Sequence, residues 1–187
     1  NFIRPWTSDY SKKSVNTTEA EMGKYASNVF GFLKVSYGNI LADISHAMTL
    51  KYAAENPDDN VSGLRPKRRR KSIVVNYDNI KDLIAADLRI GPAWLNVNHG
   101  NYCGAGGYCF PKDMAAFIAF ADSLAVQLGK KKTDPAFMKV LKKGIDVLKA
   151  AEDYNVELLK AQGLNIDDVS KHNTEIILQK RKPIRKS

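Results

Sequence analysis

The stretch from residue 18 to about residue 52 constrains the fold more than any other, because it is long and apolar on nearly every face. Between Met22 and Leu50 the only Lys, Arg, Asp or Glu residues are Lys24, Lys34 and Asp43. Thr18 followed by Glu21 has the spacing of a capping box, which predicts a helix start. A helix from 18 to 52 would be roughly 50 Å long, and its apolar faces predict burial. We therefore expect a mainly α fold, with a long central helix and a helical bundle around it.

Glycines interrupt this helix at three places. Gly23, Gly31 and Gly38 lie inside it, and each costs about 1 kcal/mol relative to alanine. Gly31 and Gly38 share one face, which Ala42 and Ser45 continue. Close approach of another helix would compensate for this cost, and a second copy of the chain is one candidate. Helix length, apolar faces and glycines together predict a homodimer.

The segments on either side of the next loop predict two further helices. Asp78 is placed to cap a short helix over "NIKDLIAADL", and Pro111 is typical of a first helical position. The residues expected to face inward are Ile80, Leu83 and Ile84 in the first helix and Phe117, Ile118, Ala121, Leu124 and Leu128 in the second.

The C-terminal third predicts one more long helix. It starts at Asp134-Pro135 and stops near Gly163, and "NIDDVSKHNTEIILQK" can add a short final one. Residues 57–72 are irregular and charged, as in a linker or an insertion. "SIVV" fits a short strand or packed coil equally well, and nowhere is a βαβ unit indicated.

The positive charge is concentrated in two segments. The net charge of +9 includes six positive charges in "RPKRRRK", residues 65–71, and five in the tail "KRKPIRKS". Without those eleven charges the remainder is about −2 (9 − 11). A solvated insertion and a loose tail are therefore favoured over nucleic-acid binding, although contact with an acidic partner stays open.

Other features bear on the compartment. No run approaches the roughly 18 apolar residues of a membrane-spanning helix, and we recognise no signal peptide. Two cysteines in 187 residues are too few for a disulfide scaffold, which favours a reducing cytoplasm. Because the sequence starts at Asn1, we expect a piece of a longer polypeptide.

The most distinctive stretch is the glycine–cysteine loop "CGAGGYCFPKD", residues 103–113. It lacks the third glycine of a dinucleotide loop and the hydrophobic strand that should precede one. Cys109, just before a predicted helix, lies where unpaired N–H groups favour a thiolate, with Lys112 and Asp113 nearby. The residues alone leave two interpretations open: a catalytic nucleophile, or an inert cysteine in a tight turn. His99, Cys103 and Cys109 lack a fourth ligand and the spacing of a zinc site, so no metal is expected.

Three motifs in order resemble the UDP-glucose/GDP-mannose dehydrogenase family. "GAGGYCFPKD" is similar to its catalytic-cysteine motif, G-x-G-G-[SY]-C-[FL]-x-K-D. "EAEMGKYASNVFGFLKVSYGN" resembles its long central helix, with the signature A-E-x-x-K-x-x-x-N. "AADLRIG" resembles the D-x-R-I-G segment that precedes the cysteine loop. The resemblance covers about residues 17–125 and implies the family's central helical domain, similar to the C-terminal domain of 6-phosphogluconate dehydrogenase.

This resemblance implies a chemistry. The family oxidises the C6 alcohol of a nucleotide sugar to a carboxylate with two NAD⁺, and the Gly-Gly-Tyr-Cys run suggests a UDP-sugar such as UDP-glucose. By position, Cys109 matches the nucleophile that forms a thiohemiacetal and then a thioester. Lys24 and Asn28 match the pair that stabilises oxygen charge or positions water, and Asp113 matches the carboxylate that assists proton transfer and hydrolysis.

Other positions are implied to contact the substrate. Arg89 matches an arginine that reaches a sugar nucleotide on the neighbouring subunit, and Lys112 is the motif's supporting lysine. Gly104, Gly106 and Gly107 would let the backbone approach a ligand closely.

The resemblance also implies a domain organisation. We expect residues 1–16 to be a linker from an absent NAD-binding Rossmann domain and residues 17–165 to be the catalytic-cysteine and dimerisation domain. Residues 57–72 would be its basic insertion and 166–187 a basic tail. NAD would be bound by a domain outside this chain, so the chain alone should be inactive. The alternatives are a non-catalytic helical dimerisation module and a basic nucleic-acid-binding protein.

Overall fold

The computed structural model describes residues 15–55, 75–98, 100–170 and 174–184, which form helices and connecting loops without a strand. The basic insertion expected at 57–72, His99 and residues 1–14 of the expected linker lie outside the described residues. The helices are α1 (Thr17–Glu55), α2 (Tyr77–Ala85), α3 (Cys109–Gly129), α4 (Pro135–Ala161), α5 (Ile166–Ser170) and α6 (Thr174–Lys180). The expected mainly α class is confirmed.

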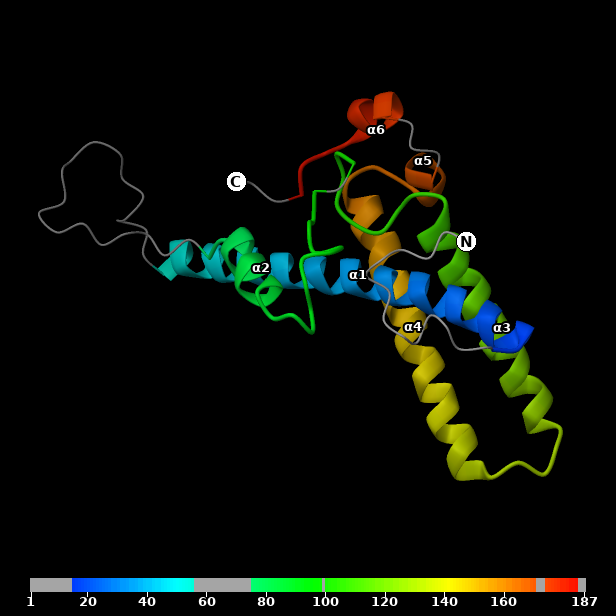
Figure 1. Cartoon of the computed structure of the whole chain (residues 1–187). Helices are drawn as coiled ribbons and strands as arrows, with labels where there is room; N and C mark the ends of the chain where they lie inside the picture. The colour runs from blue at the N-terminus through cyan, green and yellow to red at the C-terminus, as the bar shows by residue number, and fades with distance from the viewer. Residues whose placement is uncertain (1–14, 56–74, 99, 171–173, 185–187) are drawn as a thin grey trace, which may run out of the picture.

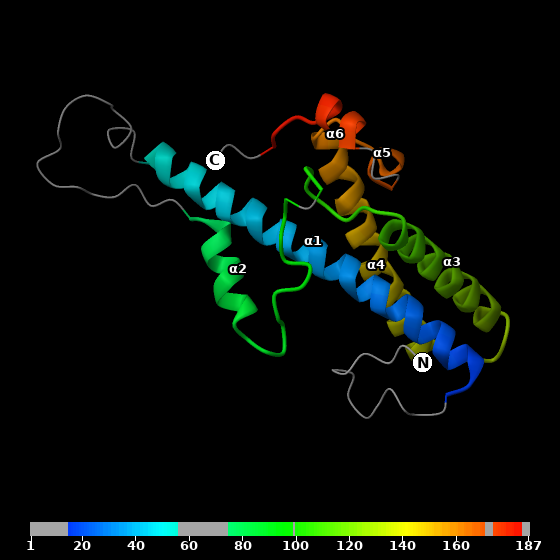
Figure 2. The ribbon, with the colours of Figure 1, turned by 45° about the horizontal axis from the view of Figure 1, so that its top comes forward.

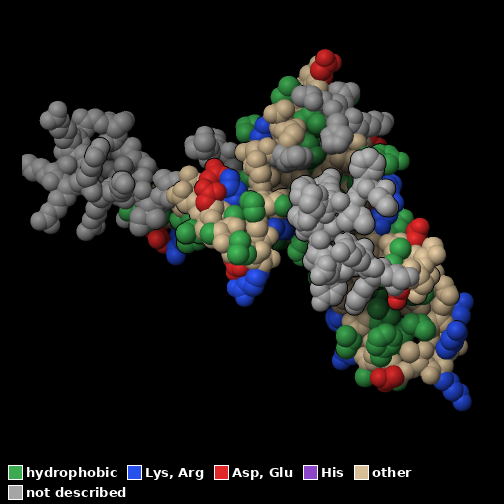
Figure 3. Space-filling view, in the orientation of Figure 1, with side chains coloured by type: hydrophobic (Ala, Val, Ile, Leu, Met, Phe, Trp, Pro, Cys, Tyr) green, Lys and Arg blue, Asp and Glu red, His purple; other side chains and the backbone are tan. Residues whose placement is uncertain are grey.

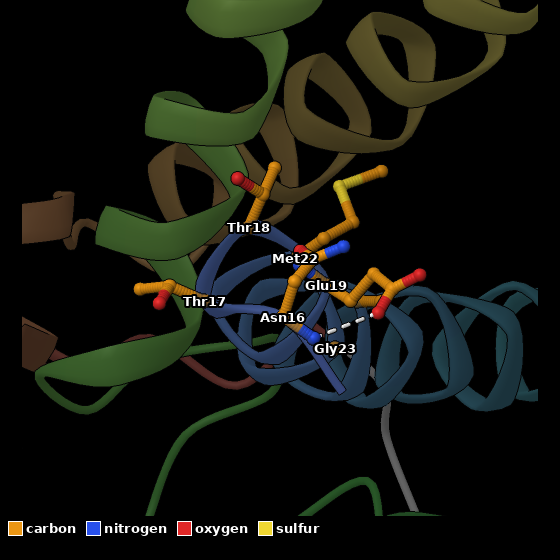
Figure 4. A pocket seen from close by; sticks show the side chains of 7 residues that line it. Asn16, Thr17, Thr18, Glu19, Met22 and Gly23 are labelled. Atoms are coloured by element: carbon orange, nitrogen blue, oxygen red, sulfur yellow. Dashed lines mark hydrogen bonds between the residues drawn. The ribbon is translucent and has the colours of Figure 1, made fainter. Parts of the chain in front are cut away.

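Helix α1 is the long central rod that the sequence predicts (Figures 1 and 2). Its capping box lies two residues before the predicted one. The Asn16 side chain accepts from the Glu19 N–H at 2.9 Å, and the Asn16 N–H donates to the Glu19 carboxylate at 2.9 Å. Figure 4 shows the second of these bonds beside a hollow that Thr18 and Met22 also line. The cap of Thr18 and Glu21 was therefore wrong, because Asn16 is an equally good N-cap residue with a glutamate three positions on.

Helices α3 and α4 form an antiparallel hairpin that crosses the N-terminal half of α1 (Figures 1 and 2). Asp134 caps α4 by accepting from the N–H groups of Ala136 and Phe137, and Gly163 follows its end with φ +76°. The sequence predicted both signals. One core lies where the hairpin meets α1, and its buried members are Val29, Phe32, Ala105, Met114 and Ile118.

Two inward-facing predictions were wrong. Leu83 in α2 is 76% exposed and Leu124 in α3 is 39% exposed. The cap of α2 is Asn76, whose side chain accepts from the N–H of Asp78, so that Asp78 belongs to the first turn. Both leucines continue the apolar period of their helices beyond the surface that a neighbouring element covers. Periodicity alone does not show where that covered surface ends.

The segment after α4 packs onto the end of the hairpin. Helices α5 and α6 lie beside the start of α3 and the end of α4 (Figure 1). A second core joins them to the loop before α3, with Tyr102, Leu159, Leu164, Val169 and Ile177 all buried. The short final helix suggested by the sequence is therefore present as two helices that belong to the packed structure.

The glycine stripe of α1 is covered from within the chain. A Cβ on Gly31 would lie 2.5 Å from the Phe110 ring, and one on Gly38 would lie 2.8 Å from the Tyr77 hydroxyl. These contacts explain both glycines without a second copy. The glycines therefore no longer support a homodimer, which stays a prediction on other grounds.

Apolar side chains also reach the surface of the hairpin. Figure 3 shows them on the visible face of its lower end, with Lys and Arg along the edge. The exposed ones in α3 and α4 include Phe120, Val126, Phe137, Val140 and Val147. No helix in the described part of the chain has the length and hydropathy needed to span a membrane.

Candidate active site at the start of helix α3

Cys109 is the first residue of α3, and its side chain is exposed. The helix starts two residues before Pro111, the start predicted from sequence, and Tyr108 precedes it without a side-chain capping bond. No capping side chain therefore competes with a ligand for the first backbone N–H groups of α3. Cys103, by contrast, is buried, with its sulfur 3.5 Å from the Asn98 side-chain oxygen. The two thiols thus lie in opposite environments.

A buried carboxylate lies one turn after Cys109. Asp113 is 1% exposed. One of its oxygens accepts from the Lys112 ammonium at 2.5 Å, and the other accepts from the Asn28 amide at 2.5 Å. Asn28 comes from α1, so this bond joins the two helices whose motifs the sequence singled out. The structure thus brings Asn28, Lys112 and Asp113 into one cluster, which we call the carboxylate cluster.

The partners of Asp113 keep it ionised. The hydrogen bond from Lys112 lowers the pKa of Asp113 most, burial opposes it, and the bond from Asn28 and the charges of Lys112 and Lys24 lower it further. The same hydrogen bond raises the pKa of Lys112. A carboxylate with both oxygens engaged and a lowered pKa is a weak base. This geometry suits a side chain that orients its neighbours.

Lys24 and Arg89 lie farther from this cluster. Lys24 is exposed on α1, with its ammonium 5.9 Å from the centre of the Tyr25 ring, and it acts on Asp113 through charge alone. Arg89 is 89% exposed and forms a two-pronged pair with Asp87, at 2.6 Å for the shortest contact. Within the described residues, no hydrogen bond or ion pair links Arg89 to the carboxylate cluster.

Sequence reasoning missed a lysine that holds the turn after Arg89. Lys34 is buried in α1, and its ammonium donates to the carbonyls of Ile90 at 2.5 Å and Gly91 at 3.1 Å. Burial lowers the pKa of Lys34. A lysine inside an apolar helix was the available signal, because such a residue must find acceptors.

The three glycines of the loop contact other residues of the chain. A Cβ on Gly104 would lie 2.7 Å from the Asn155 side-chain oxygen, and one on Gly106 would collide with the Tyr102 hydroxyl. Gly107 has φ +74° and donates its N–H to the Val169 carbonyl at 3.2 Å. These contacts account for the glycines by folding, and their predicted contact with a ligand stays a prediction.

Phe110 anchors the start of α3. Its ring covers Gly31 of α1 and meets Trp94 edge to face, with ring centroids 5.7 Å apart. Trp94 has a positive φ of 62°, which is rare for an aromatic residue. Phe110, next to Cys109, thus packs between α1 and the loop that contains Trp94. Gly31 was the sequence feature that could have indicated this packing.

A small cavity lies behind the first turns of α3. It has a volume of about 300 Å³, and Lys112, Glu152 and Asn155 line it together with Phe32 and Ser170. Burial raises the pKa of Glu152, and the neighbouring Asp153 raises it further. The sequence gave no signal for Glu152, because a single glutamate in an amphipathic helix is ordinary.

Neither a cluster of metal-ligating side chains nor a dinucleotide-binding unit is found among the described residues. They contain no group of three or more His, Cys, Asp or Glu side chains that could hold a metal ion. They also contain no strand–turn–helix unit, which a Rossmann phosphate site requires. NAD therefore does not fit the part of the chain that the structure describes.

Comparison with known proteins agrees with the motifs. The curated UDP-glucose 6-dehydrogenase AglM of Haloferax volcanii is 36% identical over 104 residues, which are 56% of this chain and 17% of that protein. The chain thus matches only a small part of this relative's length. No solved structure gives a significant match. Residues 69–133 match the model of the UDP-glucose/GDP-mannose dehydrogenase family, central domain. The resemblance is thereby confirmed: this chain is similar to the central domain of the UDP-glucose/GDP-mannose dehydrogenase family.

Proposed function

We propose that this chain is the catalytic-cysteine core of a nucleotide-sugar 6-dehydrogenase that oxidises UDP-glucose, or a related UDP-sugar, to the uronate. The observation that supports this most is the placement of an exposed Cys109 one turn before the carboxylate cluster. The match to the family's central domain and the similarity to a UDP-glucose 6-dehydrogenase agree with this function.

In this proposal the sulfur of Cys109 attacks the C6 carbonyl carbon of the aldehyde. A C–S bond forms, the carbonyl π pair moves to oxygen, and the proton lost by the thiol is taken up by that oxygen, which gives a thiohemiacetal. Lys24 and the second N–H of Asn28 are donors that can stabilise the oxygen charge. Water then hydrolyses the thioester formed after oxidation, which releases the carboxylate and returns the thiol.

Asp113 acts in this proposal mainly by holding Asn28 and Lys112. Its two oxygens accept one bond from each, so direct proton abstraction would first require one bond to break. We therefore propose that Asp113 orients donors near Cys109, and its predicted role in proton transfer and hydrolysis stays a prediction.

The oxidation steps need a hydride acceptor, and the family implies NAD for it. Because the described residues do not fit a dinucleotide, we assign NAD to a domain beyond them. We therefore assign no hydride-transfer step to the described residues of this chain. The residues of this chain bind the sugar carbon covalently and stabilise its oxygen.

NADH formation in a joined protein tests the proposal. We expect none from this chain alone with UDP-glucose and NAD⁺. When the chain replaces the matched region of the Haloferax relative, we expect two NADH per sugar, and Cys109→Ala should lower the rate by at least about 100-fold, since nucleophile removal typically costs that much or more. Cys103→Ala is the matched control and should keep the rate within about twofold. NADH from the chain alone, or an active Cys109→Ala protein, would contradict the proposal.

We also propose that α1 forms a homodimer, now on the basis of its exposed apolar side chains. Phe30, Tyr37, Ile40, Ile44 and Met48 are all more than one third exposed, and their spacing of three, four or seven places them along one side of the helix. A stripe of this kind is typical of a helix covered by another helix.

Sedimentation can test this dimer. At tens of micromolar we expect a dimer, and Ile44→Lys should shift it to monomer, because a charge would be buried in the interface. Leu83→Lys, at the 76% exposed position in α2, should leave the dimer unchanged. A monomeric unaltered chain would contradict this proposal. If a dimer formed but Cys109→Ala did not lower the rate of NADH formation, the non-catalytic dimerisation module would be favoured.

A further inference from the structure

Two buried amide side chains, Asn155 in α4 and Gln162 at the C-cap of α4, each bind one residue of the glycine–cysteine loop through both of its backbone groups. Asn155 accepts from the Ala105 N–H at 2.7 Å and donates to the Ala105 carbonyl at 3.0 Å. Gln162 accepts from the Cys103 N–H at 2.7 Å and donates to the Cys103 carbonyl at 2.8 Å. Asn155 is 1% exposed and Gln162 is 0% exposed.

These four bonds replace the backbone partner that a strand would have. The loop forms no strand, yet Cys103 and Ala105 are both buried, where an unpaired N–H or carbonyl is costly. Asn155 and the C-cap residue Gln162 are seven residues apart, about two helical turns, so both amides lie on the same side at the end of α4. Gly104 lies between the two bound residues. A Cβ on Gly104 would come within 2.7 Å of the Asn155 side-chain oxygen and 3.4 Å of the Leu158 side chain.

The bound residues lead directly into the candidate site. Ala105 lies four residues before Cys109 and belongs to the core with Met114 of α3. Gly107, two residues before Cys109, is tied by its own N–H to Val169. The chain between the amide pair and the first turn of α3 is therefore short and held at both ends.

We propose that Asn155 and Gln162 are positioning residues, which fix the course of the loop and with it the place of the Cys109 sulfur beside the carboxylate cluster. This inference rests on the proposed function of Cys109. A carboxamide supplies a donor and an acceptor side by side in one plane at neutral pH without charge, which matches the N–H and carbonyl of one buried residue.

The test measures how fast each thiol of the chain reacts with a pyridyl disulfide, which works in acid and at neutral pH. Cys103 is buried, so its rate reports opening of the loop. We expect Asn155→Leu and Gln162→Met to raise the Cys103 rate by at least about tenfold and to lower the Cys109 rate by about threefold as the first turn of α3 loosens. Ile145→Ala, a buried position elsewhere in α4, is the control for general destabilisation and should change the Cys103 rate less than about twofold.

Asn155→Asp separates positioning from simple packing. A protonated carboxyl can accept from the Ala105 N–H and donate to the Ala105 carbonyl, as the amide does, whereas a carboxylate can only accept. Burial favours the protonated form in acid. At pH 5 the reaction rates of Cys103 and Cys109 in this variant should equal those of the unaltered chain at the same pH. At pH 8 the Cys103 rate should be higher and the Cys109 rate lower than in the unaltered chain.

Each outcome decides the inference. A protected Cys103 in the folded Asn155→Leu and Gln162→Met variants, or equal opening by Ile145→Ala, overturns it. So does an Asn155→Asp variant that behaves alike at both pH values, and this variant decides the matter if the apolar ones fail to fold. An inert Cys109 in the unaltered chain would instead contradict the proposed function and leave the Cys103 comparison intact.

Discussion

We expect Gly104→Ala to lower the free energy of unfolding by about 2–5 kcal/mol relative to the unaltered chain. Gly104 has φ +113°, a region that residues with a Cβ rarely occupy. The added methyl would also lie 2.7 Å from the side-chain oxygen of Asn155, so the amide would have to give up its place against Ala105. Strain and a displaced hydrogen-bond partner therefore add in one substitution. Denaturant unfolding followed by circular dichroism measures the difference.

Gly91→Ala provides the matched control for Gly104→Ala. Gly91 also has a positive φ, +64°, but a Cβ there would meet nothing within 4 Å. Its loss should be about 1–2 kcal/mol, from backbone strain alone. Equal losses in the two variants would mean that the contact with Asn155 contributes nothing.

Asn28→Leu is expected to cost about 1.5–3 kcal/mol of unfolding free energy at pH 7, the usual range for a hydrogen bond to a charged group. Leucine removes the donor to a buried carboxylate that would keep Lys112 as its one hydrogen-bond partner among the described residues. Ser27→Leu, at the exposed neighbouring position, controls for placing leucine in this part of α1 and should stay within about 0.5 kcal/mol.

The cost of Asn28→Leu should depend on pH. Since the pKa of Asp113 is lowered in the folded chain, its ionisation stabilises the fold above the unfolded pKa of about 3.9. That contribution is lost as pH falls through the folded value. The penalty should therefore be full at neutral pH, shrink below about pH 4, and nearly vanish in an Asp113→Asn background. A penalty that is constant from pH 3 to pH 7 would show that Asn28 acts through packing.

The sequence predicted the large elements because their signals are local. The long, mostly apolar run indicated α1, and Asp134-Pro135 and Gly163 indicated both ends of α4. The starts of α1 and α2 were misplaced by one or two residues, because several good capping residues lie next to each other there. Leu83 and Leu124 were misassigned, because a helix carries its period beyond the surface that another element covers.

The site was predicted in its residues more than in its contacts. The motifs assigned Asn28, Lys112 and Asp113 to the same candidate site, and in the structure hydrogen bonds join these three side chains. Arg89 was expected at a substrate, and its pairing with Asp87 could not be read from spacing because it depends on a local turn.

The residues that sequence reasoning missed act across long separations. Asn155 reaches Ala105 over 50 residues and Gln162 reaches Cys103 over 59. On an amphipathic helix, an asparagine or glutamine is ordinarily a surface residue, so nothing local distinguishes these two. Their burial depends on how the loop folds, which a single sequence does not reveal.

The most direct measurement of the central claim is the order in which the two thiols of the folded, unaltered chain are alkylated. After brief iodoacetamide treatment at neutral pH, mass spectrometry should find Cys109 modified at least about tenfold faster than Cys103, because Cys109 is exposed at the start of α3 and Cys103 is buried. In denaturant the preference should disappear. If Cys103 reacts first, or Cys109 stays inert while the chain is folded, Cys109 is not the accessible nucleophile that the account requires.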